Sequence, residues 1–139
     1  MAEPGRYLCS KSFYLLTRVI GKKFKNGKYS YFLNDSIYHS FRCTETDSFY
    51  FEKSTDQFYS KISSDEVCSV PGETHVASLV GMTCDGTDII TKEISVPNNL
   101  KIGDWLCIGG CGAYTISCGG NFNGMEVSDK IITMSIQLP

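Results

Sequence analysis

The spacing of hydrophobic residues changes near residue 25 and divides the chain into two predicted parts. Before it, the run KSFYLLTRVIGKKF has apolar residues at three- and four-residue intervals, with Ser10 as a candidate N-cap and Gly21 as a stop signal. This pattern predicts a helix over residues 11–23. A short extended segment is expected before it, at residues 4–9. The chain is thus predicted to open with one strand and one helix.

After residue 25, short apolar runs alternate with turns, as in a β structure. Asn26-Gly27 is a hairpin signal, and a Tyr- and Phe-rich run follows it. Residues 52–73 are polar and Ser-rich, which predicts a loop. The other predicted strands are SIYHSFRC, DSFYFEK, HVASLVGM, DIITKEISV, GDWLCIGG, AYTISCG and KIITMSI. Most of the 13 glycines fall between such runs, so the pattern predicts a mainly β barrel or sandwich.

Composition narrows the classes of function. The 139 residues suffice for one modest core, and 13 basic against 15 acidic residues leave a net charge of −2. That balance gives no basic patch for nucleic acid or for an anionic membrane. No apolar run approaches the length of a membrane-spanning helix, and the start of the chain lacks the layout of a secretory signal. We therefore expect neither a nucleic-acid nor a membrane partner.

The cysteines indicate a reducing compartment. There are seven, an odd and scattered set, which favours free thiols and a cytoplasmic location. Cys107 and Cys111 form a CxxxC pair, but both histidines lie far away in the sequence. A zinc site needs more ligands than this pair supplies, so no metal site is expected.

Four short segments combine residues that could bind a ligand, and each also has a simpler interpretation. Glu3 and Arg6 flank a Pro-Gly bend and could point at one ligand, or form an exposed ion pair. Thr46-Asp47-Ser48, taken alone, is weak evidence for a ligand-binding site. The segment GMTCDGTD, residues 81–88, has two possible interpretations: an active-site loop, or a tight turn around a buried cysteine. In residues 109–114, glycines allow close backbone approach to a ligand and a tyrosine hydroxyl can donate to a phosphate, or the segment is a plain turn.

The order of these segments resembles one enzyme family. AEPGR, ND.IY.SF.C, TCDGTD, GDW and GAYT…FNG resemble the C-terminal part of eukaryotic-type ornithine decarboxylases, which are fold-type III, pyridoxal-phosphate-dependent amino-acid decarboxylases. The resemblance runs from residue 2 to about residue 125. It implies a mainly β, Greek-key-like barrel or sandwich at residues 26–139. Residues 1–25 would be the last strand and helix of a truncated β/α barrel.

The resemblance implies a binding site for pyridoxal 5′-phosphate. Glu3 would sit against the pyridine nitrogen and keep the ring protonated, so that the ring accepts electrons as carbon dioxide leaves. Arg6 and Tyr114 would contact the cofactor phosphate, for which a guanidinium fork is well suited. Pro4 and Gly5 belong to the same cofactor-binding motif, and Gly5 leaves room for the phosphate.

The resemblance also implies roles toward the substrate. Asp47 would bind the distal amine of ornithine, although Thr46 stands where the family has tyrosine. Asp85 would help to hold that ammonium, and Cys84 would return a proton to the substrate carbon after decarboxylation. Both would reach into the other subunit's active site across a homodimer interface. The implied reaction, L-ornithine to putrescine and carbon dioxide in polyamine biosynthesis, is favoured because aspartate rather than glutamate follows the cysteine.

Other parts of the family's site lie upstream of these motifs. The Schiff-base lysine is expected on an N-terminal barrel, so this chain alone is expected to be inactive and to need a barrel fragment or a full-length decarboxylase subunit. Three interpretations stay open: a truncated or split decarboxylase, a non-catalytic antizyme-inhibitor-like subunit that binds a decarboxylase or its regulator, and a gene relic. The joint presence of the motif residues favours the first. Thr46, and His39 in place of the family's usual glycine, keep the second open.

Overall fold

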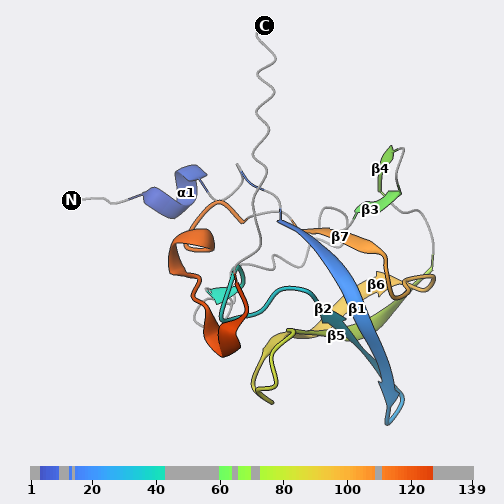
Figure 1. The fold of residues 1–139 in the computed structure, drawn as a ribbon. Coiled ribbons are helices and arrows are strands. Elements are labelled where there is room, and N and C mark those ends of the chain that lie inside the picture. The colour runs from blue at the N-terminus through green and yellow to red at the C-terminus, as the bar shows by residue number, and fades with distance from the viewer. Residues whose placement is uncertain are drawn as a thin grey trace, which may run out of the picture.

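Seven strands form a single curled sheet (Figure 1). The order across the sheet is β4-β3-β7-β1-β2-β5-β6. β2 and β5 are parallel, and every other neighbouring pair is antiparallel. The strands are β1 (Leu15–Lys25), β2 (Lys28–Leu33), β3 (Ser60–Ser63), β4 (Glu66–Ser69), β5 (Thr74–Val80), β6 (Ile89–Pro97) and β7 (Trp105–Ile108). The predicted mainly β fold is confirmed.

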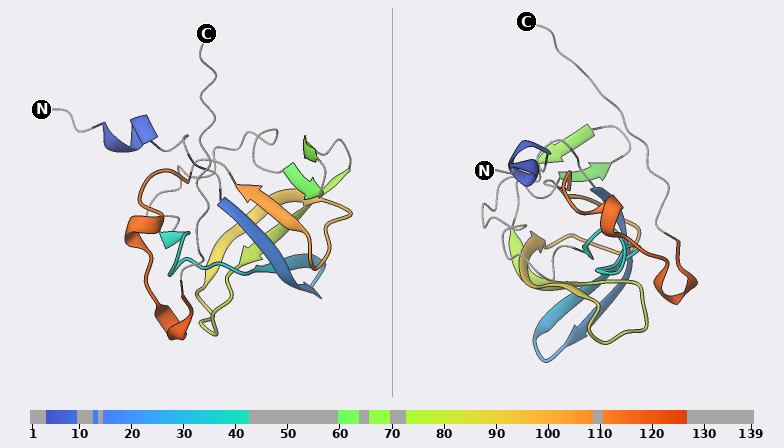
Figure 2. Two further views of the ribbon diagram at one scale, coloured as in Figure 1. Left: turned by 45° about the horizontal axis from the view of Figure 1, so that its top comes forward. Right: turned by 90° about the vertical axis from the view of Figure 1, so that its left-hand side faces the viewer.

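The computed structural model describes residues 4–9, 13, 15–42, 60–63, 66–69, 73–108 and 111–126. The short helices that lie outside the sheet include α1 (Gly5–Cys9), η3 (Ile116–Cys118) and η4 (Phe122–Gly124). Figure 2 shows α1 beside the orange-red segment that carries η3 and η4. Within the described part of the chain, no helix is long and apolar enough to cross a membrane.

The β1–β2 hairpin follows the predicted turn. Asn26 and Gly27 both have positive φ, 52° and 78°, as a two-residue type I′ turn requires. Lys25 pairs with Lys28 directly across the turn. The runs predicted as HVASLVGM, DIITKEISV and GDWLCIGG are also confirmed, as β5, β6 and β7.

The predicted strand-then-helix order at the start of the chain is wrong. The segment expected to be extended forms α1, where the Leu8 N–H donates to the Pro4 carbonyl at 3.2 Å. The segment predicted as a helix over residues 11–23 forms most of β1. From Thr17 to Ile20 its side chains alternate between buried and exposed, and β1 pairs with β2 on one side and β7 on the other. Pairing on both edges outweighs the helical spacing, and the β-branched residues Thr17, Val19 and Ile20 suit a strand.

Three further sequence assignments are wrong. Residues 36–42, predicted as a strand, form turns because the Asp35 carboxylate accepts hydrogen bonds from the Ser36 and Ser40 N–H groups, at 2.7 and 2.9 Å. AYTISCG forms turns and η3 instead of a strand. The polar stretch 52–73 contains the β3–β4 hairpin, so it is not loop throughout. The predicted strands DSFYFEK and KIITMSI lie outside the described residues.

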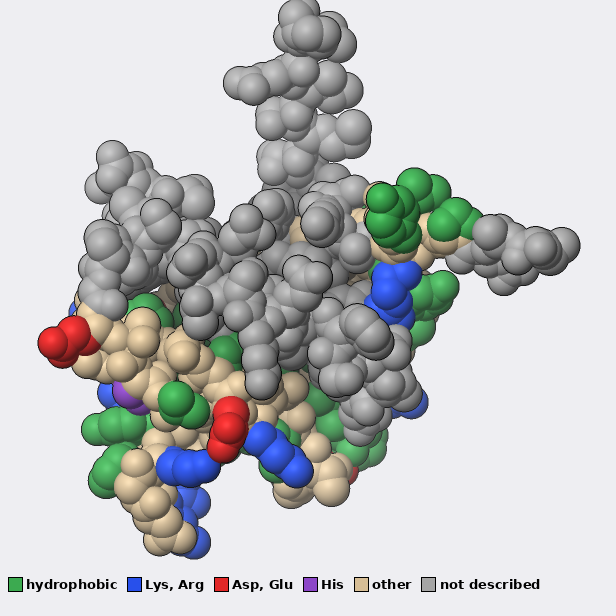
Figure 3. Space-filling view, turned by 180° about the vertical axis from the view of Figure 1, so that it is seen from behind, with side chains coloured by type: hydrophobic (Ala, Val, Ile, Leu, Met, Phe, Trp, Pro, Cys, Tyr) green, Lys and Arg blue, Asp and Glu red, His purple; other side chains and the backbone are tan. Residues whose placement is uncertain are grey.

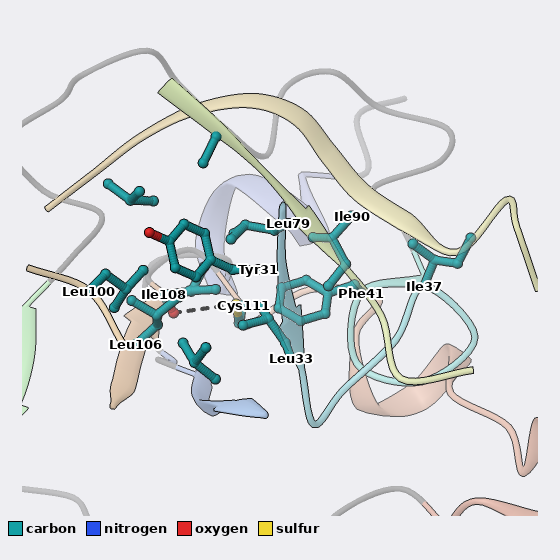
Figure 4. Close-up of a cluster of buried hydrophobic side chains, with 13 residues drawn as sticks. Tyr31, Leu33, Ile37, Phe41, Leu79, Ile90, Leu100, Leu106, Ile108 and Cys111 are labelled. Atoms are coloured by element: carbon teal, nitrogen blue, oxygen red, sulfur yellow. Dashed lines mark hydrogen bonds between the residues drawn. The ribbon is translucent and has the colours of Figure 1, made fainter. Parts of the chain in front are cut away.

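The hydrophobic core fills the concave side of the sheet and continues under the turns that follow β2 (Figure 4). Tyr31, Leu33 and Leu79 are each fully buried at its centre. Ile37 and Phe41, from the turns at 36–42, belong to the same core, and so does Cys111. The remaining members are Val19, Ala77, Ile90, Val96, Leu100, Leu106 and Ile108. These turns are therefore fixed by burial, although they are not strands.

The outer side of α1 is apolar and solvent-exposed. Tyr7 is 85% exposed and Leu8 is 70% exposed. Figure 3 shows hydrophobic side chains gathered on this helix at the edge of the molecule. An apolar helix this exposed is typical of a surface that another segment covers.

Candidate active site

The end of α1 packs against the glycine-rich segment after β7. A Cβ atom at Gly112 would lie 1.8 Å from the Cys9 carbonyl oxygen and 3.1 Å from the Phe13 ring, so only glycine fits there. The Cys111 N–H donates to the Phe13 carbonyl at 3.1 Å. These contacts place two predicted ligand-binding segments, which are about a hundred residues apart in the sequence, side by side.

Arg6 and Tyr114 meet at this contact. The guanidinium carbon of Arg6 lies 4.8 Å from the centroid of the Tyr114 ring, a cation–π arrangement. Tyr114 has φ 56°, uncommon outside glycine, and half of its surface is exposed. A Cβ atom at Gly5 would come within 4.0 Å of the Tyr114 hydroxyl. A cation, a phenol hydroxyl and an uncovered glycine backbone thus converge in a group that suits an anion such as phosphate.

The second cluster is the turn at residues 81–88, which one buried carboxylate organises. Asp88 is fully buried and accepts hydrogen bonds from Ser36 Oγ at 2.9 Å, the Ile37 N–H at 3.1 Å, and the Thr83 N–H and Oγ1 at 3.1 and 2.7 Å. Four donors offset much of the cost of burying the charge. Asp88 thereby fixes the turn to the segment after β2.

This turn presents Cys84 and Asp85 outward. Cys84 is exposed, so the alternative of a tight turn around a buried cysteine is wrong. The Asn123 side-chain amide donates to the Cys84 sulfur at 3.2 Å. Asp85 accepts hydrogen bonds from the Tyr38 hydroxyl and from the N–H and hydroxyl of Thr87. These donors, with Tyr38 the largest contributor, hold the pKa of Asp85 below its ordinary value.

One continuous segment joins the two clusters. Residues 111–126 begin at the contact with α1, pass Tyr114 and η3, and end beside the turn at residues 81–88. At the far end, the Phe122 ring stacks on the Tyr38 ring with centroids 4.1 Å apart. The Arg6–Tyr114 pair and the Cys84–Asp85 turn therefore belong to one connected framework.

The predicted site residues divide into three sets. Gly5, Arg6 and Tyr114 lie together, next to Pro4 at the start of α1. Cys84 and Asp85 lie together in the second cluster. Glu3, Thr46 and Asp47 fall outside the described residues, and their assigned roles stay predictions.

The sequence interpretation gave no role to the residues that support the second cluster. Tyr38, Asp88, Phe122 and Asn123 all contact the Cys84–Asp85 turn or the residues that hold it. Tyr38, Phe122 and Asn123 lie within the segments IY.SF and FNG, which carried the resemblance, so the signal for them was present. Separately, neither ring nitrogen of His39 has a hydrogen-bond partner among the described residues, although the side chain is only 1% exposed.

The described residues include free cysteines but no group of metal ligands. Cys9, Cys84 and Cys118 are free thiols. Among the residues that the structure describes, no three His, Cys, Asp or Glu side chains are grouped so that they could hold a metal ion.

Comparison with known proteins shows the family. The model of the pyridoxal-dependent decarboxylase C-terminal sheet domain matches residues 6–112, and the chain belongs to this family. The chain is 31% identical over 139 residues to a chloroplastic ornithine decarboxylase of Nicotiana glutinosa, across all of this chain and 32% of that relative. It is 35% identical over 141 residues to antizyme inhibitor 2 of Xenopus laevis, across 92% of this chain and 28% of that relative.

A solved structure shows the same relationship. The lysine/ornithine decarboxylase of Vibrio vulnificus, complexed with cadaverine, matches with a TM-score of 0.71 and 28% identity, across 88% of this chain and 30% of that chain. The resemblance inferred from the sequence is thereby confirmed. The chain spans about a third of the length of these relatives.

Proposed function

We propose that this chain is the C-terminal part of an ornithine decarboxylase that converts L-ornithine to putrescine and carbon dioxide with pyridoxal 5′-phosphate. The observation that carries the proposal is the connected framework of an anion-binding pair and a thiol–carboxylate turn, in a chain of the pyridoxal-dependent decarboxylase family. The ornithine decarboxylases among its relatives support this substrate.

The residues of the first cluster fit the cofactor phosphate. The Arg6 guanidinium supplies charge, the Tyr114 hydroxyl supplies a hydrogen bond, and Gly5 leaves its backbone uncovered. We assign Glu3 to the pyridine nitrogen, as the resemblance implies. When bound, pyridoxal phosphate supplies an electron-accepting ring for the decarboxylation.

The second cluster fits the substrate. The exposed Cys84 thiol is accessible for returning a proton to the substrate carbon. Asp85 is ionised at neutral pH, as an ordinary aspartate is, and the hydrogen bonds that lower its pKa favour the same charged form, which can pair with an ammonium group. We assign Asp47 as the second carboxylate for that ammonium, with Thr46 beside it.

We propose that the site is completed by an N-terminal barrel that carries the Schiff-base lysine, and that the chain alone is inactive. The boundary between the barrel and the β-domain then lies before β1, because β1 is paired within the sheet. We further propose a homodimer with active sites at its interface and a cytoplasmic location.

Reconstitution tests the function. The chain is co-expressed with the N-terminal barrel region of a related ornithine decarboxylase, and putrescine and carbon dioxide are measured with ornithine and pyridoxal phosphate. We expect activity that Cys84→Ala and Asp85→Ala each reduce at least about a hundredfold. Cys118→Ala, which removes another exposed thiol, is the matched control and retains activity. Equal loss in the control, or no turnover in any pairing, contradicts the proposal.

A second candidate is a non-catalytic subunit that binds a decarboxylase or its regulator. The 35% identity to an antizyme inhibitor is compatible with it, and Thr46 and His39 keep it open. The same pairings distinguish the two functions, because this candidate predicts a tight complex without putrescine formation.

A further inference from the structure

Tyr38 lies between the Cys84–Asp85 turn and the end of the 111–126 segment, and the proposed reaction has not used it. Its hydroxyl donates to Asp85 Oδ2. On the other carboxylate oxygen, Oδ1, Asp85 accepts from the Thr87 N–H at 2.8 Å and the Thr87 hydroxyl at 2.9 Å. Two residues thus supply three donors to one carboxylate.

This arrangement leaves Asp85 with few positions at which it can accept another hydrogen bond. A carboxylate has about four lone-pair sites, and here three donors are already in place. The hydroxyls of Tyr38 and Thr87 also lie 3.3 Å apart, and each already directs its proton to Asp85. The carboxylate therefore cannot rotate without breaking several hydrogen bonds, and about one acceptor position remains for an external donor.

Tyr38 is itself held from three directions. Its ring stacks on Phe122 at 4.1 Å. Its carbonyl accepts the Gly120 N–H at 3.0 Å, and its own N–H donates to Ser36 Oγ at 3.0 Å. Ser36 Oγ in turn donates to the buried Asp88 carboxylate at 2.9 Å. The phenol is thus tied both to the core of the turn and to the segment that carries Tyr114.

We propose that Tyr38 is a positioning residue that fixes the Asp85 carboxylate so that its free acceptor position meets a substrate ammonium group. The inference rests on the proposed function for its ligand, but the Tyr38–Asp85 contact itself does not. The lowered pKa of Asp85, with Tyr38 as its largest cause, agrees with this arrangement. Within one chain, the 111–126 segment then connects the phosphate-binding pair to the Asp85 turn through Phe122 and Tyr38, and in the proposed homodimer that turn serves the partner's active site.

The first test is a pH titration of the Asp85 carboxyl carbon by NMR in the full chain. Tyr38→Phe keeps the ring and its stacking but removes the donor, so the titration midpoint of Asp85 is expected to rise toward that of an ordinary aspartate. Thr87→Val keeps the backbone donor, and we expect a smaller rise. Phe122→Leu removes the ring that holds the phenol, and a smaller rise is expected there too. Tyr29→Phe, on β2, removes a phenol hydroxyl elsewhere and leaves the midpoint unchanged.

The outcomes decide the proposal. An Asp85 midpoint that is the same in Tyr38→Phe and the unmodified chain overturns it. If Tyr38→Phe does not fold, as judged by its amide spectrum, the Thr87→Val and Phe122→Leu chains decide, and unchanged midpoints in both overturn it.

The second test uses the chain paired with the barrel region. Tyr38→Phe is expected to raise KM for ornithine about tenfold, the loss of one hydrogen bond to a charged group, with kcat changed less than about twofold. An unchanged KM overturns the positioning role. A shifted midpoint in a chain that shows no turnover in any pairing supports the Tyr38–Asp85 link and overturns the proposed function, so the two failures are distinguishable.

Discussion

At the scale of single residues, the turn that presents Cys84 depends on the burial of a charge. Asp88 accepts four hydrogen bonds from the turn itself and from the segment after β2. A Cβ atom at Gly81 would lie 2.1 Å from the Asp88 carboxylate. The glycine is needed for close approach to a fixed carboxylate, rather than for flexibility of the turn.

Gly81→Ala is therefore expected to lower the free energy of unfolding by about 3 kcal/mol, because Asp88 must give up buried hydrogen bonds to make room. Gly86→Ala, in the same turn, is the matched control. A Cβ there meets nothing within 4 Å, and we expect a change under about 0.5 kcal/mol. Urea unfolding of both variants measures the difference, and equal stability of the two would contradict the role given to Asp88.

Asp85 gives a prediction for the pH dependence of stability. Its folded pKa is lowered, so its contribution is fully present above the ordinary aspartate value of about 3.9 and is lost as the pH falls through the lower folded value. The difference in unfolding free energy between the unmodified chain and Asp85→Asn should be constant from about pH 7 to 5 and shrink below about pH 4. The contributions of the other carboxylates to the pH dependence are the same in both chains, so they cancel in this difference. A difference that grows on acidification is the contrary result.

At this scale, the sequence identifies the groups that do chemistry more readily than the groups that place them. Cys84 and Asp85 stand out because a thiol and a carboxylate adjoin between glycines. Their supports come from far along the chain: Tyr38 is 47 residues from Asp85, and Asn123 is 39 residues from Cys84. Such pairs depend on how turns pack in three dimensions, which local patterns do not report.

At the scale of elements, a strand with partners on both edges took the place of a predicted helix. Thr17, Val19 and Ile20 are β-branched residues that suit a strand, whereas the apolar spacing around them also fits a helix. Pairing with β7, which lies about ninety residues later, helped to decide the outcome. The Asn26-Gly27 hairpin was predictable because its signal is local. The turns at 36–42 differ for a local reason instead, the hydrogen bonds that the Asp35 carboxylate accepts from the chain just after it.

The docking of α1 depends on a single glycine. Gly112→Ala would place a methyl group against the Cys9 carbonyl, so we expect α1 to move away and its amide protons to lose protection from exchange. Gly120→Ala is the control in the same segment, because its Cβ meets only an ordinary contact at 3.9 Å from the Tyr38 carbonyl. Hydrogen exchange followed by mass spectrometry compares the two variants. Full protection of α1 in Gly112→Ala would show that the close approach is not required.

At the scale of the whole molecule, the two clusters lie on a chain that supplies only part of the proposed enzyme. The framework from Tyr114 to Asn123 is built entirely within this chain. By contrast, α1 carries the Arg6 side of the site and leaves its apolar side chains in solvent (Figure 3). Under the proposed function, the barrel that precedes α1 covers these side chains when the site is complete.

This yields a prediction for assembly. The double variant Tyr7→Ser/Leu8→Ser removes the two most exposed apolar side chains of α1, so its complex with the barrel region is expected to weaken by at least about tenfold, because burial of such side chains stabilises by about 1.5–3 kcal/mol each. Phe24→Ser is the matched control: this side chain is 61% exposed on the β1–β2 hairpin, at the opposite end of the molecule from α1 (Figure 1). Titration calorimetry measures both affinities. An equal loss of affinity in the two variants would show that the barrel region does not bind at α1. A loss in the double variant alone would show that α1, which carries Arg6, contacts the barrel region.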